Sequence, residues 1–145
     1  MPERFTFVAA VHLFLVRADG AVLLLRRCNT GYEDGNWSVV AGHLDGGEEV
    51  KTAAIREARE EVGVTIDPAD LDIVGVMHRK STDERVDFFL VAARWEGEAR
   101  NREPDKCDAL QWCAPDHLPA NIVPYVRRAL DNYRQGRWFD SYGWE

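Results

Sequence analysis

The sequence predicts one domain of the α+β class that spans residues 1–145. The length of 145 residues suits a single domain with a sizeable core. Hydrophobic residues make up 46% of the chain and charged residues 30%, a composition typical of globular domains. Short apolar runs are interrupted by two segments with helical character, one in the middle of the chain and one near its end.

The first segments are expected to be strands. Residues 5–16 and 21–27 are apolar and rich in residues that favour strands, and the turn sequence Ala18-Asp19-Gly20 separates them. We therefore predict that they form a hairpin. Residues 28–36 contain Asn, Thr, Gly and Asp and are expected to form a loop, after which residues 37–41 form a short strand.

A flexible loop and a helix are expected next. Three glycines lie within residues 42–47, which indicates a flexible loop. The segment Glu49–Val62 has helical character, and its apolar residues Ile55, Ala58 and Val62 would form a stripe that packs on a sheet. Gly63 is a typical residue to end the helix.

The second half predicts three further strands and a second helix. The apolar runs 73–79, 86–95 and 110–113 favour strands. The segment 124–135 begins with proline, as helices often do, and predicts a helix. The tail 136–145 contains Trp138, Phe139, Tyr142 and Trp144, which we expect to pack either on the domain or on a partner.

Charge and cysteine content exclude several functional classes. With 18 basic and 25 acidic residues the net charge is −7, which argues against a nucleic-acid-binding surface. No apolar stretch has the length of a membrane span. Cys28, Cys107 and Cys113 are odd in number and do not follow a zinc-binding spacing, so we expect reduced thiols and a cytoplasmic protein.

Three carboxylates in the first predicted helix are the main candidates for a functional site. Glu57, Glu60 and Glu61 lie at positions i, i+3 and i+4 and therefore project from one helix face. A solvated acidic face is the simpler interpretation. However, like charges at this spacing repel one another, and a glycine-rich loop precedes the helix. Clustered oxygen ligands favour Mg²⁺, with Mn²⁺ as the alternative ion.

Residues 42–64 resemble the Nudix box, G-x5-E-x7-R-E-U-x-E-E-x-G-U, in which U is aliphatic. All nine defined positions are filled, by Gly42, Glu48, Arg56, Glu57, Ala58, Glu60, Glu61, Gly63 and Val64. The resemblance implies an αβα sandwich with a mixed sheet between helices. It also implies divalent-metal-dependent hydrolysis of a nucleoside diphosphate linked to another moiety.

The resemblance also assigns roles to residues of the box. It implies that Glu57, Glu60 and Glu61 bind Mg²⁺, together with the backbone carbonyl of Ala41. It implies that Arg56 organises the site by tying the loop to the helix through Glu48. The chain differs from many relatives in having Val40-Ala41, where those relatives have Pro-Gly.

The box does not identify the general base. Relatives that use a later glutamate place it directly before a Trp, whereas this chain has Gln111 before Trp112. The remaining candidates are Glu57, Glu103 and Asp108. His43 lies next to the box glycine, but an ordinary loop histidine is the simpler interpretation.

The chain is similar to the compact MutT-like branch of the family. This similarity implies hydrolysis of a nucleoside triphosphate, including oxidised dNTPs, to NMP and pyrophosphate. A nucleotide sugar is the alternative substrate, and a non-catalytic binding module is the alternative class. We expect a small nucleotide as the partner and, because the net charge is −7, no nucleic-acid or membrane partner. The expected state is a monomer or homodimer. The candidate substrate contacts are Arg27, Arg85, Gly42 and Trp112.

Overall fold

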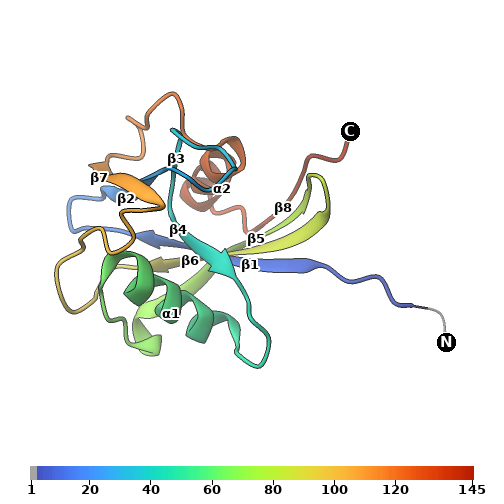
Figure 1. Cartoon of the computed structure of the whole chain (residues 1–145), viewed down its shortest axis with the longest axis horizontal. Helices are drawn as coiled ribbons and strands as arrows, with labels where there is room; N and C mark the ends of the chain where they lie inside the picture. The colour runs from blue at the N-terminus through green and yellow to red at the C-terminus, as the bar shows by residue number, and fades with distance from the viewer. Residues whose placement is uncertain (1–2) are drawn as a thin grey trace.

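A computed structural model describes residues 3–145 of the chain. Within this range the structure contains two α-helices, one short 3-10 helix and eight strands (Figure 1). In chain order the elements are β1 (Val8–Leu15), β2 (Val22–Arg27), β3 (Trp37–Ser38), β4 (Val40–His43), α1 (Val50–Val62), η1 (Pro68–Asp70), β5 (Leu71–Lys80), β6 (Glu84–Ala92), β7 (Cys107–Cys113), α2 (Pro124–Gln135) and β8 (Phe139–Tyr142).

The described strands form two sheets. The larger sheet has the order β4-β1-β6-β5-β8, and the smaller has the order β3-β2-β7. In the larger sheet β1 runs parallel to β6 and antiparallel to β4, while β5 is antiparallel to β6 and parallel to β8. The sheet is therefore mixed, and the predicted α+β class is confirmed.

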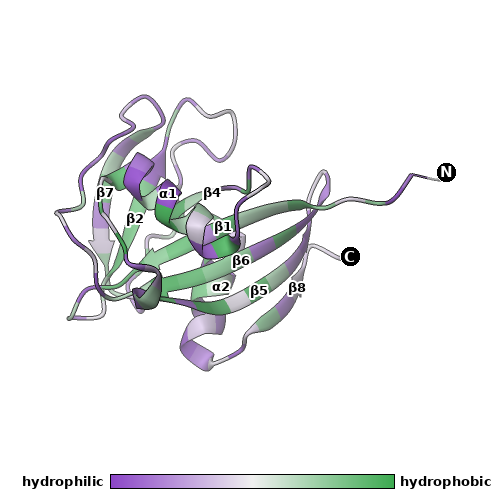
Figure 2. Cartoon of the chain, turned by 90° about the horizontal axis from the view of Figure 1, so that it is seen from below, coloured by the Kyte–Doolittle hydropathy of each residue, from purple (hydrophilic) through white to green (hydrophobic). Residues whose placement is uncertain are grey.

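The two helices cover opposite faces of the larger sheet. In β1, Val11 and Leu13 pack with Ala54 and Val62 of α1, whereas Phe14 packs with the cluster that contains Val126 of α2. This division follows from the alternation of side chains along a strand. Figure 2 shows hydrophobic residues concentrated along β1 and β6, between the helices. The αβα arrangement implied by the sequence resemblance is present.

The predicted hairpin of the first two strands is wrong. β1 belongs to the larger sheet and β2 to the smaller, and an isolated bridge between Val16 and Val22 joins them. Both edges of β1 are already paired, one with β4 and the other with β6. Because a strand has only two edges, β2 cannot pair along it and continues into the second sheet.

The bounds around the glycine-rich loop also differ from the prediction. The expected strand over residues 37–41 is divided between β3 and β4, which belong to different sheets. Gly42 lies in β4 and not in the loop, since it pairs with Val11 of β1. Helix α1 begins one residue later than predicted, because the Glu49 side chain caps it by accepting a hydrogen bond from the Thr52 backbone N–H at 2.9 Å.

The ends of the chain's helices agree closely with the sequence signals. Gly63 ends α1 in the left-handed conformation, with φ of 75°. Helix α2 has the predicted bounds. The tail packs back on the domain through β8, although Trp138 and Phe139 remain 65% and 51% exposed. Neither α-helix within residues 3–145 is long and apolar enough to cross a membrane.

Candidate functional site

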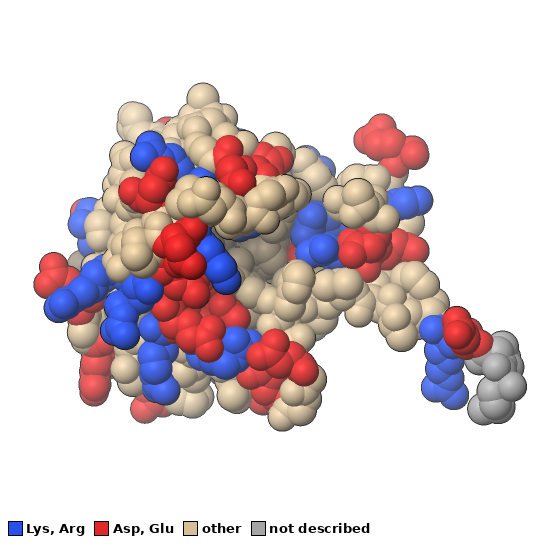
Figure 3. Space-filling view, in the orientation of Figure 1, with Lys and Arg blue, Asp and Glu red and all other residues tan. Residues whose placement is uncertain are grey.

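A cavity of about 750 Å³ opens beside β4, between α1 and the start of α2. Figure 3 shows acidic side chains gathered over α1 next to a hollow in this face, with basic side chains around it. The cavity brings together most of the residues predicted for the site. It is lined by the predicted residues Arg27, Ala41, Gly42, Glu57, Glu60, Glu61 and Arg85, and by the candidates His43 and Glu103.

The carboxylate of Glu61 lies deepest among the acidic groups of α1. Its Oε2 accepts a hydrogen bond from the backbone N–H of Ala41 at 3.3 Å. Burial and the neighbouring Glu57 carboxylate raise the pKa of Glu61 well above its ordinary value of 4.5. A cation bound near Glu57 and Glu61 would relieve the repulsion between their two carboxylates. The electrostatics of the site therefore favour a bound cation.

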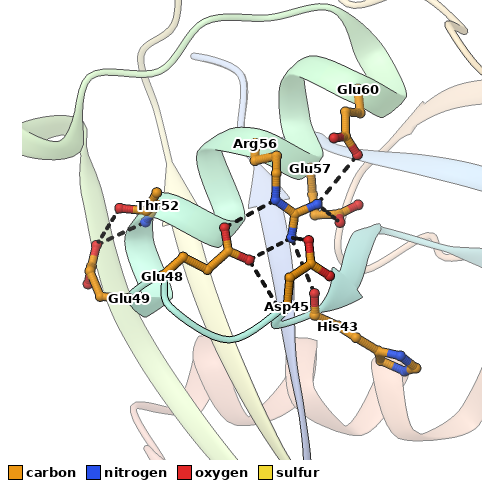
Figure 4. A network of polar contacts seen from close by, with 8 residues as sticks. All are labelled: His43, Asp45, Glu48, Glu49, Thr52, Arg56, Glu57 and Glu60. Atoms are coloured by element: carbon orange, nitrogen blue, oxygen red, sulfur yellow. Dashed lines mark hydrogen bonds and ion pairs between the residues drawn. The ribbon is translucent and has the colours of Figure 1, made fainter.

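Arg56 connects the loop after β4 to the acidic face of α1 (Figure 4). Its guanidinium donates to both oxygens of Glu48, at 2.8 and 3.2 Å, and to Oε1 of Glu57 at 2.6 Å. It also donates to the backbone carbonyl of His43 at 3.3 Å. Hydrogen bonding to Arg56 lowers the pKa of Glu48. These contacts join the loop to the helix through Glu48, which is the connection that the family resemblance implies.

The donor set suits a hard divalent cation. Three carboxylates and the Ala41 carbonyl supply oxygen ligands only, which is the chemistry of Mg²⁺ and Mn²⁺ sites. No group of three His, Cys, Asp or Glu side chains among residues 3–145 already has metal-binding geometry. In Figure 4 the Arg56 guanidinium donates to the carboxylates of Glu57 and Glu60, at 2.6 and 3.5 Å.

Gly42 provides the space that the Glu57 carboxylate occupies. A Cβ placed on Gly42 would overlap the carboxyl group of Glu57. The Gly42→Ala variant is therefore expected to fold, because the Glu57 side chain can move, but to lose about 10–100-fold in turnover, since the carboxylate is displaced. Steady-state rates and thermal melts of Gly42→Ala measure the two effects. Gly75→Ala is the control, because its backbone is not in the left-handed region and an added Cβ would meet its neighbours at 3.7 Å or more, an ordinary van der Waals distance.

Glu103 is the candidate base that the structure places best. It lies in the segment that connects β6 to β7 and lines the cavity, and burial raises its pKa. Asp108, in contrast, lies outside the cavity lining and pairs with Arg26 at 2.7 Å on the surface. Glu57 lines the cavity but is held by Arg56. The cavity therefore brings together two of the three candidates.

The two predicted substrate-binding arginines line the cavity in different ways. Arg27 donates to the backbone carbonyl of Tyr32 at 2.7 Å and lies over the ring of that residue, so it holds the loop 28–36 in place. Arg85 donates to Asp83 at 2.8 Å, and one of its nitrogens lies 3.2 Å from Nε2 of His43. Among residues 3–145, two guanidinium nitrogens of Arg27 form hydrogen bonds, with Tyr32 and Thr30, whereas all three nitrogens of Arg85 contact Asp83 or His43. Arg27 therefore has the less occupied guanidinium of the two.

Trp112 does not join the other predicted residues. Its ring stacks on Trp95 at a centroid distance of 6.0 Å, and the guanidinium of Arg17 lies 4.7 Å from the ring centre. Trp112 does not appear in the cavity lining. The structure therefore does not support the prediction that this ring contacts the substrate. Tyr32, which lines the cavity with an exposed ring, was missed because its loop sequence gives no stacking signal.

A buried polar cluster at the α2 end of the cavity was also missed. Arg79 of β5 donates to both oxygens of Asp87 of β6, at 2.6 and 3.4 Å, and its guanidinium lies 3.7 Å from the ring centre of Tyr125. The Tyr125 hydroxyl lies 3.0 Å from Nε2 of His12. Burial lowers the pKa of His12 to about 4 and raises the pKa of Tyr125 to about 12, so both are uncharged at neutral pH.

The only local signal for this cluster was His12, which interrupts an apolar run. The remaining members belong to three separate elements that the fold brings together. His12, Arg79 and Tyr125 line the cavity, while Asp87 lies behind Arg79. The cavity thus has an acidic end at α1 and a second polar end at the start of α2.

Known proteins share both the sequence pattern and this fold. The family model described as NUDIX domain matches residues 6–133. An RNA pyrophosphohydrolase of Novosphingobium aromaticivorans is 28% identical, with 86% of each chain covered. A putative 8-oxo-dGTP diphosphatase of Bacillus subtilis is 32% identical, with 69% of this chain and 64% of that protein covered.

The structural comparison agrees with the sequence comparison. The crystal structure of a MutT NUDIX hydrolase from Burkholderia pseudomallei is 30% identical and superposes with a TM-score of 0.80, covering 88% of this chain and 98% of that one. The family model covers most of the chain and the box carboxylates line the cavity. The chain therefore belongs to the Nudix family and is a Nudix pyrophosphohydrolase with MutT-like structural neighbours.

Proposed function

We propose that the protein hydrolyses a nucleoside triphosphate, including oxidised dNTPs, to NMP and pyrophosphate with Mg²⁺ as its cofactor. The observation that carries the proposal is the placement of Glu57, Glu60 and Glu61 on one wall of a cavity of about 750 Å³. The similarity to a MutT NUDIX hydrolase and to a putative 8-oxo-dGTP diphosphatase supports this choice of substrate.

Different residues of the cavity would bind the metal ion and accept the proton. Glu57, Glu60, Glu61 and the Ala41 carbonyl would hold Mg²⁺, with Mn²⁺ as the alternative ion. When bound, the ion neutralises the phosphates and lowers the pKa of water. The oxygen of the attacking water forms a bond with the α-phosphorus, and Glu103 accepts the proton that the water loses. The α–β phosphoanhydride bond breaks, and pyrophosphate leaves. Burial raises the pKa of Glu103 above its ordinary value of 4.5, which increases its basicity.

The positive groups of the cavity position the polyphosphate. Arg85 and Lys106 line the same cavity as the carboxylates and can pair with phosphate oxygens. Arg56 and Glu48 act as positioning residues, because their contacts fix the loop and the helix relative to each other. The net charge of −7 is thereby compatible with an anionic substrate, provided that a divalent cation accompanies it.

A substrate panel tests the proposal. The protein is incubated with each NTP and dNTP, with 8-oxo-dGTP, with a nucleotide sugar and with a 5′-triphosphorylated RNA, in Mg²⁺ and in EDTA. We expect pyrophosphate and NMP from at least one nucleoside triphosphate, and none in EDTA. Turnover of the RNA or the nucleotide sugar alone would contradict the proposal, as would activity in EDTA. Absence of any turnover would favour a binding module.

The remaining predictions concern the protein as a whole. A single domain over residues 1–145, a monomeric or homodimeric state, a cytoplasmic location and the lack of nucleic-acid and membrane partners are retained as proposals. The three cysteines are free, in agreement with the expectation of reduced thiols. Since several relatives are named for action on RNA, the RNA arm of the panel tests the nucleic-acid prediction directly.

A further inference from the structure

The face of the larger sheet that carries α1 is only partly covered by this helix. Helix α1 packs on β4 and β1, whereas β5 and β8 extend beyond it, as Figure 2 shows. Ile73 of β5 pairs with Leu90 of β6, and Val76 pairs with Phe88. Phe139 of β8 pairs with Val76. Because Leu90 and Phe88 pack with the cluster under α1, and paired residues point to one side of a sheet, the apolar face continues past the helix.

The N-terminal arm, residues 3–7, extends this apolar face. Figure 1 shows the arm leaving the body of the domain at the start of β1. The Phe7 ring lies 4.9 Å from the ring of Phe5 and 5.3 Å from that of His78 in β5. The Trp144 ring lies 4.7 Å from the same imidazole, and its Nε1 donates to the His78 carbonyl at 2.9 Å. The arm before Phe7 makes no backbone hydrogen bond with another residue of the range 3–145.

These residues form one surface, which we call the apolar strip. It consists of Phe5, Phe7, Ile73, Val76, His78, Phe139 and Trp144. Five of the eight large hydrophobic side chains that are exposed within residues 3–145 belong to it. The exposed apolar surface of the described chain is therefore concentrated at one end of the larger sheet.

Charged side chains are nearly absent from the apolar strip. Arg79 and Asp140, which belong to the same strands, point to the opposite face, where they contact Tyr125 and Arg128 of α2. Lys80 lies at the end of the strip, over the Trp144 ring. Depletion of charged residues at the centre of an exposed apolar surface is the compositional signal of a protein–protein interface.

The area of the apolar strip matches that of a stable dimer interface. Its five exposed side chains are 42–62% exposed, and a large side chain covers about 150–250 Å², so roughly 500 Å² of apolar surface is in contact with water. A standard interface buries about 800 Å² on each partner, and about 65% of a homodimer interface is apolar, which also gives roughly 500 Å². Two-fold symmetry brings the same patch of both copies together, and an apolar patch with few charges is compatible with itself.

We propose that two copies of the chain associate about a two-fold axis through the apolar strip, with the arm of each copy against β5 and β8 of the other. The exposed rings of Phe5 and Phe7 then lose their contact with water, as does Phe139. No residue of the strip lines the cavity that holds the candidate site. Association therefore leaves the cavity open, and the proposal is independent of the proposed function.

The concentration dependence of the molar mass tests the proposal. Sedimentation velocity and light scattering after size exclusion are measured from about 1 µM to about 100 µM protein. We expect twice the monomer mass at the upper end and a dissociation constant of about 10 µM or tighter. A monomer at every concentration overturns the proposal. If that monomer cosediments with phospholipid vesicles, the strip is a membrane-binding surface and the proposal is equally wrong.

Variants on the two sides of the sheet assign the interface to the apolar strip. Phe139→Asp and Ile73→Asp place a carboxylate on the strip of both copies and should weaken association at least about 100-fold. Trp138→Asp is the matched control, because Trp138 is 65% exposed and adjacent to Phe139 but lies against α2. The control should leave the dissociation constant within about threefold of the wild-type value.

The arm is tested by Phe5→Ser combined with Phe7→Ser, which should weaken association at least about tenfold. All the replaced side chains are exposed, so the variants should fold, and thermal melts verify this. A dimer that is unchanged in Phe139→Asp and Ile73→Asp overturns the proposal, and so does equal weakening in Trp138→Asp. An unchanged dimer in the arm variant overturns the part assigned to the arm. None of these measurements uses turnover, so their outcome is distinct from that of the substrate panel.

Discussion

Glu61→Gln is expected to reduce turnover by at least about 100-fold while stabilising the metal-free protein. The carboxylate is buried beside Glu57, and both effects raise its pKa. A raised carboxyl pKa means that the folded state binds the proton more tightly than the unfolded state. The stabilisation from this proton is fully present below the ordinary pKa of 4.5 and is lost as the pH rises through the folded pKa.

Glutamine removes this dependence because its amide does not ionise. Thermal unfolding in EDTA from about pH 4 to about pH 8 should show a higher melting temperature for Glu61→Gln than for the wild type at the upper end. Added Mg²⁺ should raise the melting temperature of the wild type and have much less effect on the variant. Glu98→Gln, at an exposed position outside the cavity, is the matched control.

Two results would contradict this account of Glu61. Unchanged turnover in Glu61→Gln would remove this carboxylate from the candidate site. A metal-free variant that melts below the wild type near neutral pH would show that the carboxylate stabilises the fold, contrary to its burial beside Glu57. A functional carboxylate is often buried at a cost in stability. Replacing such a carboxylate is therefore expected to increase stability and to reduce turnover.

Local signals predicted the helices more accurately than the strand pairing. Helix α2 begins at Pro124 and ends before Gly136, which adopts a left-handed conformation with φ of 73°. Proline and glycine determine these ends through their own backbone preferences, so the chain nearby contains the necessary information. The partners of β1 do not follow from local sequence, since β4 begins 25 residues after the end of β1 and β6 lies farther still. The predicted hairpin failed for this reason.

The same distinction separates the two ends of the cavity. The acidic end could be predicted because the carboxylates of α1 and the loop before it form one continuous segment with a defined spacing. The polar end at the start of α2 could not, because Arg79, Asp87 and Tyr125 belong to three elements and follow no common spacing. Trp112 suits base stacking by its chemistry, but the fold packs its ring on Trp95, outside the cavity lining.

Replacing Arg56 should show whether the loop and the helix act as one unit. Arg56→Met removes the contacts to Glu48, Glu57 and the His43 carbonyl together. We expect turnover and the apparent affinity for Mg²⁺ to fall by about 10–100-fold, because groups that orient metal ligands typically have effects of this size. Steady-state rates over a Mg²⁺ titration measure both quantities.

Arg56→Lys separates charge from geometry. A lysine keeps the positive charge but cannot donate to both oxygens of Glu48 and to Glu57 in one plane. The lysine variant should therefore remain close to Arg56→Met, whereas full recovery would show that charge alone matters. Arg59→Met is the matched control, since Arg59 lies on the exposed part of the same helix. An equal loss in Arg59→Met would mean that α1 responds to any arginine removal, and the network around Arg56 would lose its specific role.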